Sequence, residues 1–252
     1  MLPGNRKGKG AAAAAGATGR AAGTSDMQGQ KKGLVIAIDG PSGAGKSTVA
    51  RLLAQRLGYT YIDTGAMYRA IGWKAKRDGI DPADEQGLSG LCARTEVTIH
   101  LDRNDPRILV DAIDVTGDIR TPEMGMMASA VSKSPAVRAR LLGLQRELGG
   151  HGGVVMDGRD IGTVVFPKAD LKLFLDASPE ERGQRRYREL RQKGMDVDLG
   201  RITREIQERD RQDSGRELAP LKAAADALRI DSSAMSIDEV LAFMMELAGK
   251  RV

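Results

Sequence analysis

The segment that most constrains this chain is a glycine-rich run that lies between an apolar stretch and a helical pattern. Residues 40–47 read Gly-Pro-Ser-Gly-Ala-Gly-Lys-Ser and fit the phosphate-binding loop (P-loop) pattern G-x-x-x-x-G-K-S/T. The apolar residues 34–38 before it are typical of a buried parallel strand, and apolar residues between Val49 and Leu57 recur at helical spacing after it. The order strand, loop, helix predicts an α/β fold that binds nucleotide phosphates.

Each part of the loop has a predicted role in binding a nucleotide. Glycines let successive main-chain N–H groups approach the phosphates, and the helix N-terminus adds positive charge. Lys46 is expected to reach the outer phosphates, and the Ser47 hydroxyl to ligate Mg²⁺. The candidate nucleotide-binding residues are Gly40, Pro41, Ser42, Gly43, Ala44, Gly45, Lys46, Ser47 and Thr48. The motif alone does not separate a kinase from a GTPase or an ATPase.

The positive net charge of the chain comes from its first 32 residues. The formal charge is +5, but residues 1–32 hold six Lys/Arg and one acid, which leaves 33 of each sign in residues 33–252. Residues 1–32 are dominated by Gly and Ala and predict a disordered basic tail. Because the remainder is formally neutral, we expect no nucleic-acid partner.

Composition also excludes several other classes of protein. The single cysteine, Cys92, excludes an internal disulfide, and His100 and His151 have no zinc-ligand spacing. We find neither a signal-peptide core nor an apolar stretch long enough to span a membrane. We therefore expect a cytoplasmic protein without a membrane partner.

The remainder of the chain reads as alternating strands and helices, interrupted by a hairpin. Polar and apolar residues alternate over 96–101 and 108–115 around a predicted turn at 103–106, which indicates an inserted hairpin. Strands are expected at 59–65, 154–157, 171–176 and 227–230, and helices from Met67 and at 123–132, 135–148, from Ser178 and at 237–248.

Residues 182–216 form an arginine-rich segment. It holds eleven Lys/Arg and is broken by Gly194. One interpretation is a helical hairpin that closes over the nucleotide as a lid. The alternative is a solvated helix face with ion pairs such as Glu205 to Arg209.

Several further segments, taken together, are diagnostic of a family. Residues 62–69 (IDTGAMYR), 117–121 (GDIRT), 157–167 (DGRDIGTVVFP) and 208–210 (ERD) occur in this order after the P-loop. Residues 33 to about 250 therefore resemble the bacterial cytidylate kinases. The resemblance implies a nucleoside-monophosphate kinase fold with a parallel five-stranded sheet flanked by helices. It also implies an inserted monophosphate-binding subdomain at about 63–150 and a lid at about 182–216.

The activity that the resemblance implies is phosphoryl transfer from ATP, with Mg²⁺, to CMP or dCMP, and we expect a monomer. By similarity, Ser129, Arg138 and Asp160 read the cytosine, Arg209 and Asp213 hold the ribose, and Thr64 lies near CMP. Cytosine recognition is chemically reasonable because an ionised Asp160 accepts from the exocyclic amine.

The transfer itself needs little acid or base chemistry, because the acceptor phosphate oxygen is already anionic. Catalysis reduces to aligning two polyanions without repulsion. Lys46 on the donor side and Arg69, Arg159 and Arg216 on the acceptor side are the candidate catalytic residues, since arginine makes bidentate phosphate contacts. A structural ion pair is the alternative for each arginine.

The sequence leaves open the roles of two aspartates and the choice between rival functions. Asp63 and Asp157, at strand ends, either orient Mg²⁺-bound water or accept main-chain N–H groups. The rival functions are a P-loop kinase for UMP, AMP or shikimate, and a GTP switch or nucleic-acid-associated ATPase. The GTP switch or nucleic-acid-associated ATPase is disfavoured because no N-K-x-D guanine-reading segment occurs.

Overall fold

The computed structural model describes Met1, residues 33–100 and residues 106–251. The expected tail at 1–32, apart from Met1, and most of the expected turn at 103–106 lie outside the described residues.

The centre of the fold is a parallel five-stranded sheet, which confirms the predicted fold class. Its strand order is β2-β6-β1-β7-β8, so β1, which precedes the P-loop, lies in the middle. From β1 the chain first builds β2 and β6 on one side and then β7 and β8 on the other, so the strand order reverses at β1. In open parallel sheets, ligands bind at the carboxyl ends of the strands beside such a reversal. The strands are β1 Val35–Asp39, β2 Thr60–Asp63, β6 Val154–Gly158, β7 Leu171–Asp176 and β8 Leu228–Asp231.

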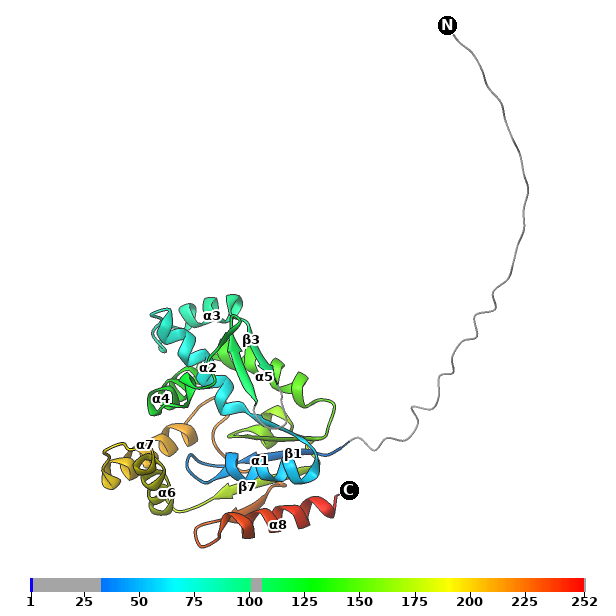
Figure 1. The fold of residues 1–252 in the computed structure, drawn as a ribbon, viewed down its shortest axis with the longest axis vertical. Coiled ribbons are helices and arrows are strands. Elements are labelled where there is room, and N and C mark those ends of the chain that lie inside the picture. The colour runs from blue at the N-terminus through cyan, green and yellow to red at the C-terminus, as the bar shows by residue number, and fades with distance from the viewer. Residues whose placement is uncertain (2–32, 101–105, 252) are drawn as a thin grey trace, which may run out of the picture. The chain divides into compact units, whose positions relative to one another are not determined.

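Each face of the sheet packs against its own set of helices. On β1, Ile36 and Ile38 belong to the core beneath α1 and α8, whereas Ala37 belongs to the core beneath α2 and α5. This period of two buries both faces of the strand, as expected for a parallel sheet. Figure 1 shows α1 and α8 beside β1 and β7. The four helices are α1 Lys46–Leu57, α2 Thr64–Arg77, α5 Pro135–Gly149 and α8 Ile237–Gly249.

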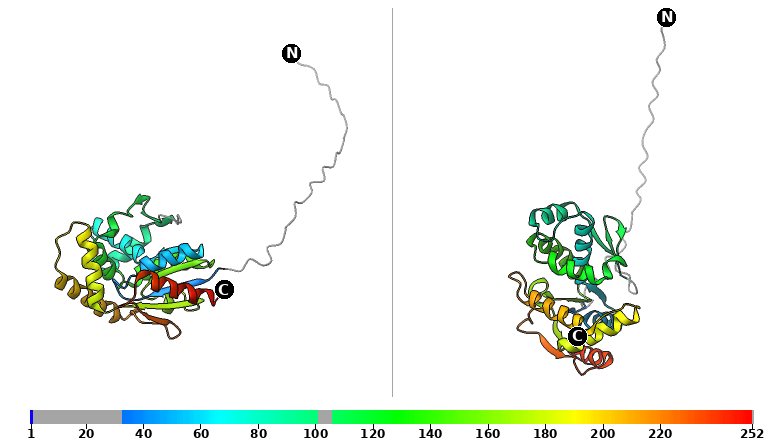
Figure 2. Two further views of the ribbon diagram at one scale, coloured as in Figure 1. Left: turned by 60° about the horizontal axis from the view of Figure 1, so that its bottom comes forward. Right: turned by 90° about the vertical axis from the view of Figure 1, so that its left-hand side faces the viewer.

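The chain between β2 and β6 builds a group of elements whose hydrophobic core is continuous with one face of the sheet. Figure 2 (right) shows this group, from cyan to green, on one side of the elements coloured yellow to red. Thr121 and Ser134 cap the helices α4 and α5 with their side chains, and a proline follows each cap, as the sequence predicts for Pro135. The remaining elements of the group are α3 Glu85–Arg94, β3 Val97–His100, β4 Arg107–Val110, β5 Ile113–Asp114, η1 Asp118–Arg120 and α4 Pro122–Val131.

The inserted hairpin is present, but its second half is not one strand. β3 pairs antiparallel with β4, and β4 pairs antiparallel with β5. Asp111 and Ala112 both have positive φ, 49° and 64°, so they form a two-residue turn between β4 and β5. The expectation of a continuous strand over 108–115 is therefore wrong, because alternation alone did not reveal this turn.

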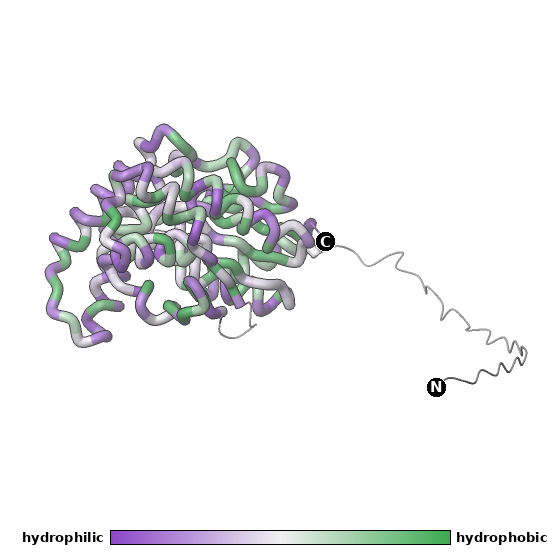
Figure 3. Tube along the Cα trace, turned by 90° about the horizontal axis from the view of Figure 1, so that it is seen from above, coloured by the Kyte–Doolittle hydropathy of each residue, from purple (hydrophilic) through white to green (hydrophobic). Residues whose placement is uncertain are grey.

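The arginine-rich segment forms a helical hairpin, α6 Pro179–Gln192 and α7 Leu199–Ser214, which confirms that part of the prediction. Leu190, Ile202 and Ile206 form a small core of their own between the two helices. Hydrophilic and hydrophobic residues alternate along many helices in Figure 3, as expected of helices with one buried face. The expected pair of Glu205 with Arg209 is wrong: Glu205 accepts from Arg201 Nε at 2.8 Å, and Arg209 lies against the P-loop.

None of the helices within the described ranges is both long and apolar enough to span a membrane.

Candidate active site

The P-loop connects the central strand to α1 through three glycines with positive φ, Gly40, Gly43 and Gly45. A Cβ on Gly40 would lie 1.9 Å from the Leu175 carbonyl oxygen, and Gly45, the N-cap of α1, has φ +90°. Lys46 Nζ donates to the Pro41 carbonyl at 2.6 Å. Burial, followed by the charge of Arg159, lowers the pKa of Lys46 to about 7. A polyphosphate bound in the loop would raise this pKa and keep the ammonium protonated.

A buried carboxylate lies beside the P-loop serine. Asp157, at the end of β6, accepts from Ser47 Oγ and from the Tyr61 hydroxyl, both at 2.9 Å. Burial raises the pKa of Asp157 to about 6, and the nearby carboxylate of Asp63 adds to the effect. The side chain of Asp157 therefore accepts hydroxyl groups rather than the main-chain N–H groups considered from the sequence. Tyr61 was not identified as a site residue from the sequence.

Asp63, at the end of β2, accepts a main-chain N–H, which is one of the two roles that the sequence left open. Its Oδ1 accepts the Ala66 N–H at 2.9 Å and so caps α2, while its Oδ2 pairs with Arg69 at 2.8 Å. The neighbouring Thr64 donates its hydroxyl to the Asp157 carbonyl at 2.8 Å. These bonds fix the start of α2, and with it Arg69, at the carboxyl end of the sheet.

Three predicted acceptor residues meet at one buried carboxylate. Asp213 of α7, 1% exposed, pairs with Arg159 Nε at 3.0 Å and with Arg216, and also accepts from Ser129 Oγ at 3.3 Å. Burial opposes ionisation, but the charges of Arg159, Arg216 and Arg209 outweigh it and lower the pKa of Asp213. Elements far apart in the sequence, β6, α4 and α7, are thus joined at this point.

A second ion pair lies next to this cluster. Arg138 of α5 pairs with Asp160, which follows β6, and Asp160 is buried. The Arg138 guanidinium lies 6.0 Å from the ring centre of Tyr68, within cation–π range. The two residues expected to read cytosine are therefore in direct contact, whereas Ser129, the third, contacts Asp213 and Arg216.

The arginines of the site outnumber its acids. Among the described residues, the five predicted acceptor arginines share three partner carboxylates, since Arg159 and Arg216 both pair with Asp213 and Arg209 donates to a neutral hydroxyl, Ser42 Oγ at 3.3 Å. Burial lowers the pKa of Arg209 to about 10, and the charge of Arg159 contributes. Within the described part of the chain, the Nε–H groups of Arg69, Arg209 and Arg216 are buried without an acceptor. Excess positive charge with unused donors is the arrangement that binds a phosphate.

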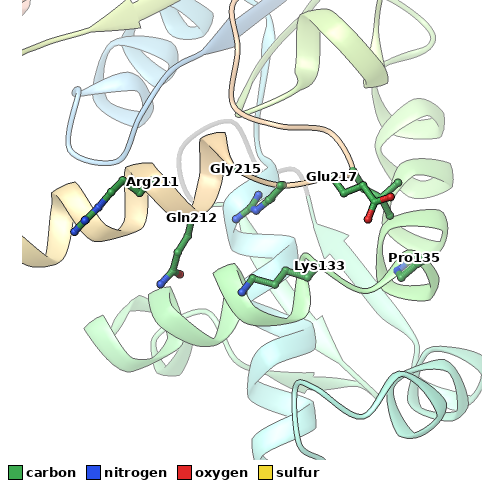
Figure 4. Close-up of a pocket in the computed structure, with 8 residues that line it drawn as sticks. Lys133, Pro135, Arg211, Gln212, Gly215 and Glu217 are labelled. Atoms are coloured by element: carbon green, nitrogen blue, oxygen red, sulfur yellow. The ribbon is translucent and has the colours of Figure 1, made fainter.

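These groups line one large cavity of about 1370 Å³ between the P-loop and the arginine cluster. The structure brings together every candidate site residue from Ser42 to Arg216 on its walls, whereas Gly40 and Pro41 lie outside the lining and shape the loop from behind. Apart from Arg209, the predicted arginines are in ion pairs, and their carboxylate partners Asp63, Asp160 and Asp213 line the same cavity. A pocket of about 460 Å³ opens beside it, at the junction of α4, α5 and the end of α7, with Lys133, Gln212 and Glu217 on its walls (Figure 4). Arg216 lines both spaces.

Two arginines that the sequence did not single out connect the helical hairpin to the P-loop. Buried Arg182 donates to the Ser42 carbonyl at 3.0 Å and pairs with Asp210 at 2.5 Å. Arg185 donates to the Ala44 carbonyl at 3.4 Å. The only available signal was their place in an arginine-rich segment, which does not distinguish them from its exposed members.

Comparison with known proteins agrees with this geometry. The family model for cytidylate kinase matches residues 36–250. A cytidylate kinase from Syntrophotalea carbinolica is 52% identical over 218 residues, which cover 86% of this chain and 93% of that protein. One from Geobacter sulfurreducens is 52% identical over 221 residues (88% and 95% covered), and one from Pelotomaculum thermopropionicum is 53% identical over 219 residues (86% and 97% covered). With a phosphate-binding loop and an arginine cluster facing one cavity and these matches over most of its length, the chain belongs to the cytidylate kinase family.

Proposed function

We propose that this enzyme transfers the terminal phosphoryl group of ATP to CMP or dCMP, forming ADP and CDP or dCDP. The observation that carries the proposal is the pairing of two phosphate-binding arrangements across one cavity. The P-loop and five arginines with a surplus of positive charge line the same cavity, and Arg209 reaches the P-loop itself. The cavity exceeds the roughly 300–1,000 Å³ that is usual for one small ligand, so two nucleotides fit better than one.

On the donor side, residues 40–48 hold the ATP phosphates, and Lys46 contacts the phosphoryl group in transfer. Ser47 and the adjacent Asp157 offer oxygen atoms, the ligand type that Mg²⁺ prefers. Among the described residues no group of three or more acidic, His or Cys side chains forms a metal site, which suits an ion bound mainly by the phosphates of ATP. When bound, Mg²⁺ neutralises charge on the phosphates.

On the acceptor side, a CMP phosphate oxygen forms the new bond to the γ-phosphorus while the bond from that phosphorus to the β–γ bridging oxygen breaks, and ADP leaves with the electron pair. No general base is required. Arg69, Arg159 and Arg216 hold the acceptor phosphate and the charge that develops in transfer. Arg209 and Asp213 hold the ribose, and Asp160, Arg138 and Ser129 read the base, with Thr64 alongside.

We also propose roles for two segments of the chain that contribute these residues. Residues of about 63–150 contribute Thr64, Arg69, Ser129 and Arg138, and we assign them to acceptor binding. Residues of about 182–216 contribute Arg209, Asp213 and Arg216, and we assign them to a lid that closes over both nucleotides and excludes water.

The test is ADP formation from ATP and Mg²⁺ with CMP, dCMP, UMP, AMP or shikimate as acceptor, in a coupled assay. We expect rapid ADP formation with CMP and dCMP and slow formation with the others. A reaction without acceptor measures ATP hydrolysis, and a reaction with EDTA tests the need for the metal. Equal rates with and without acceptor, or a preference for UMP, AMP or shikimate, contradicts the proposal.

A further inference from the structure

Asp39 is a buried carboxylate to which neither the sequence motif nor the proposed mechanism gives a role. It ends β1, immediately before the P-loop, and is 3% exposed. Its Oδ1 accepts the Ile161 N–H and its Oδ2 accepts the Gly162 N–H, both at 2.8 Å. The carboxylate is therefore bound by the main chain of a segment that follows β6 and lies more than a hundred residues away.

These bonds enclose the two site residues Arg159 and Asp160. In the sheet, Asp39 is the register partner of Gly158, the last residue of β6. The side chain of the same residue then holds Ile161 and Gly162, the start of the π-helical turn Ile161–Val165. One residue thus fixes the chain on both sides of Arg159 and Asp160.

The fit between Asp39 and this turn is tight. A Cβ on Gly162 would lie 3.3 Å from Asp39 Oδ2 and 3.2 Å from Lys172 Cδ. A Cβ on Gly158 would lie 2.6 Å from both Thr64 Oγ1 and the Ile161 side chain. Such close contacts leave the main chain around Arg159 and Asp160 little freedom to shift.

We propose that Asp39 is a positioning residue that sets Arg159 and Asp160 for the acceptor nucleotide. It acts through the main chain of residues 158–162 and contacts neither nucleotide. The inference rests on the proposed function, because Arg159 and Asp160 are assigned there to the CMP phosphate and base. It differs from a purely structural role, which would affect ATP and CMP alike or would affect stability alone.

The test compares Asp39→Asn with Asp176→Asn in steady-state kinetics. Asn offers only one acceptor oxygen and turns an NH₂ group toward the second N–H. Asp176 is the matched control: it ends the neighbouring strand β7, and its Oδ1 accepts the Ala177 N–H at 2.8 Å, but it does not contact residues 158–162. We expect Asp39→Asn to raise the KM for CMP about tenfold and to lower the CMP/UMP ratio of kcat/KM at least about threefold, with the KM for ATP changed less than about twofold. Asp176→Asn is expected to change none of these by more than about twofold.

Gly162→Ala provides a second route if Asp39→Asn does not fold, since the added Cβ pushes the turn away from Asp39 without removing its charge. We expect the same pattern with a smaller shift. Equal factors for ATP and CMP, or an unchanged CMP/UMP ratio in the variant that folds, overturns the inference.

Hydrogen exchange without nucleotides separates this inference from the proposed function. In the Asp39 or Gly162 variant, amides of residues 158–165 should exchange about tenfold faster than in the original protein, while those of residues 40–48 keep their protection. Unchanged exchange at residues 158–165 would contradict the positioning role of Asp39, whatever the substrate of the enzyme is. Absence of CMP phosphorylation by the unmodified enzyme, together with faster exchange in the variant, counts against the proposed function alone.

Discussion

Replacement of Asp160 by asparagine exchanges one carboxylate oxygen for an NH₂ group in the pair Arg138–Asp160, which we propose reads the base. The side chain is buried, and its carboxylate is paired with Arg138, itself mostly buried. Cytosine offers an exocyclic amine to such a carboxylate, whereas uracil places a carbonyl oxygen there and leaves two acceptors facing one another. The proposed lid would exclude water once both nucleotides are bound, so solvent would not relieve that conflict.

The size of the effect follows from this burial. A lost or mismatched contact in a buried site costs about 1–3 kcal/mol, or roughly 5-fold to 150-fold in kcat/KM. The amide of asparagine can turn to present either an acceptor or a donor, so the variant discriminates less. We expect Asp160→Asn to narrow the CMP/UMP ratio of kcat/KM by roughly tenfold, with most of the loss in the CMP reaction. Weaker pairing with Arg138 adds a smaller loss that is common to both acceptors.

The assay is coupled ADP detection with CMP and UMP at saturating ATP. Asp63→Asn is the control, since Asp63 also pairs with a site arginine, Arg69 at 2.8 Å, but on the proposed phosphate side. That variant should lower kcat/KM for CMP and for UMP by the same factor. If Asp160→Asn also lowers both values of kcat/KM equally, Asp160 does not read the base, and Arg138 and Ser129 must distinguish CMP from UMP.

Three further outcomes are expected. Arg159→Lys keeps the charge but loses the planar fork, so kcat/KM for CMP should fall by about tenfold or more, ~1.4 kcal/mol, and unchanged kinetics would remove Arg159 from the phosphate site. Tyr61→Phe removes the hydroxyl that donates to Asp157 at 2.9 Å and should lower kcat a few-fold, about 1 kcal/mol. The control Tyr59→Phe removes an acceptor for the Leu34 N–H at 3.0 Å and should leave kcat unchanged. Equal losses of kcat in the two variants would refute a role for Tyr61 in the site. Burial raises the pKa of Asp39 from its ordinary 3.8 to about 6, so between these values the folded protein binds a proton that the unfolded chain does not. The free energy of unfolding of the original protein, minus that of Asp39→Asn, should therefore rise by about 1 kcal/mol as the pH falls from 7 to 5. Urea unfolding measures this difference, and a difference that does not change with pH would contradict the raised pKa of Asp39.

The parts of the fold that could be predicted are those with a strong local pattern. The P-loop lies between a continuous apolar strand and a periodic helix, and Pro135 and Ser178 mark helix starts that the structure confirms. Helix α3 was not predicted, because its ten residues include two glycines and bury only Leu88, Leu91 and Cys92. The turn at Asp111 and Ala112 was missed because neither residue is the glycine or asparagine that usually marks positive φ.

The candidate site was predictable as a set of residues but not as a set of contacts. The P-loop pattern predicted Lys46 and Ser47, and the resemblance predicted the residues that we propose bind the acceptor. The sequence did not indicate that Asp157 accepts from Ser47 and Tyr61, or that Asp39 holds the turn after Asp160, because these contacts join segments about a hundred residues apart. A strand-end aspartate has the same appearance in a sequence whether it faces a metal, a hydroxyl or a main-chain N–H.

The most direct test of the proposed function is a crystal structure with CMP, Mg²⁺ and a non-hydrolysable ATP analogue bound. We expect the phosphates of the analogue on residues 40–48 and the CMP phosphate between Arg69 and Arg159, in line with the terminal phosphate of the analogue. We also expect the exocyclic amine of cytosine within hydrogen-bond distance of Asp160. CMP bound outside the cavity, or with its base on the P-loop side and its phosphate away from the arginines, would contradict the proposed function.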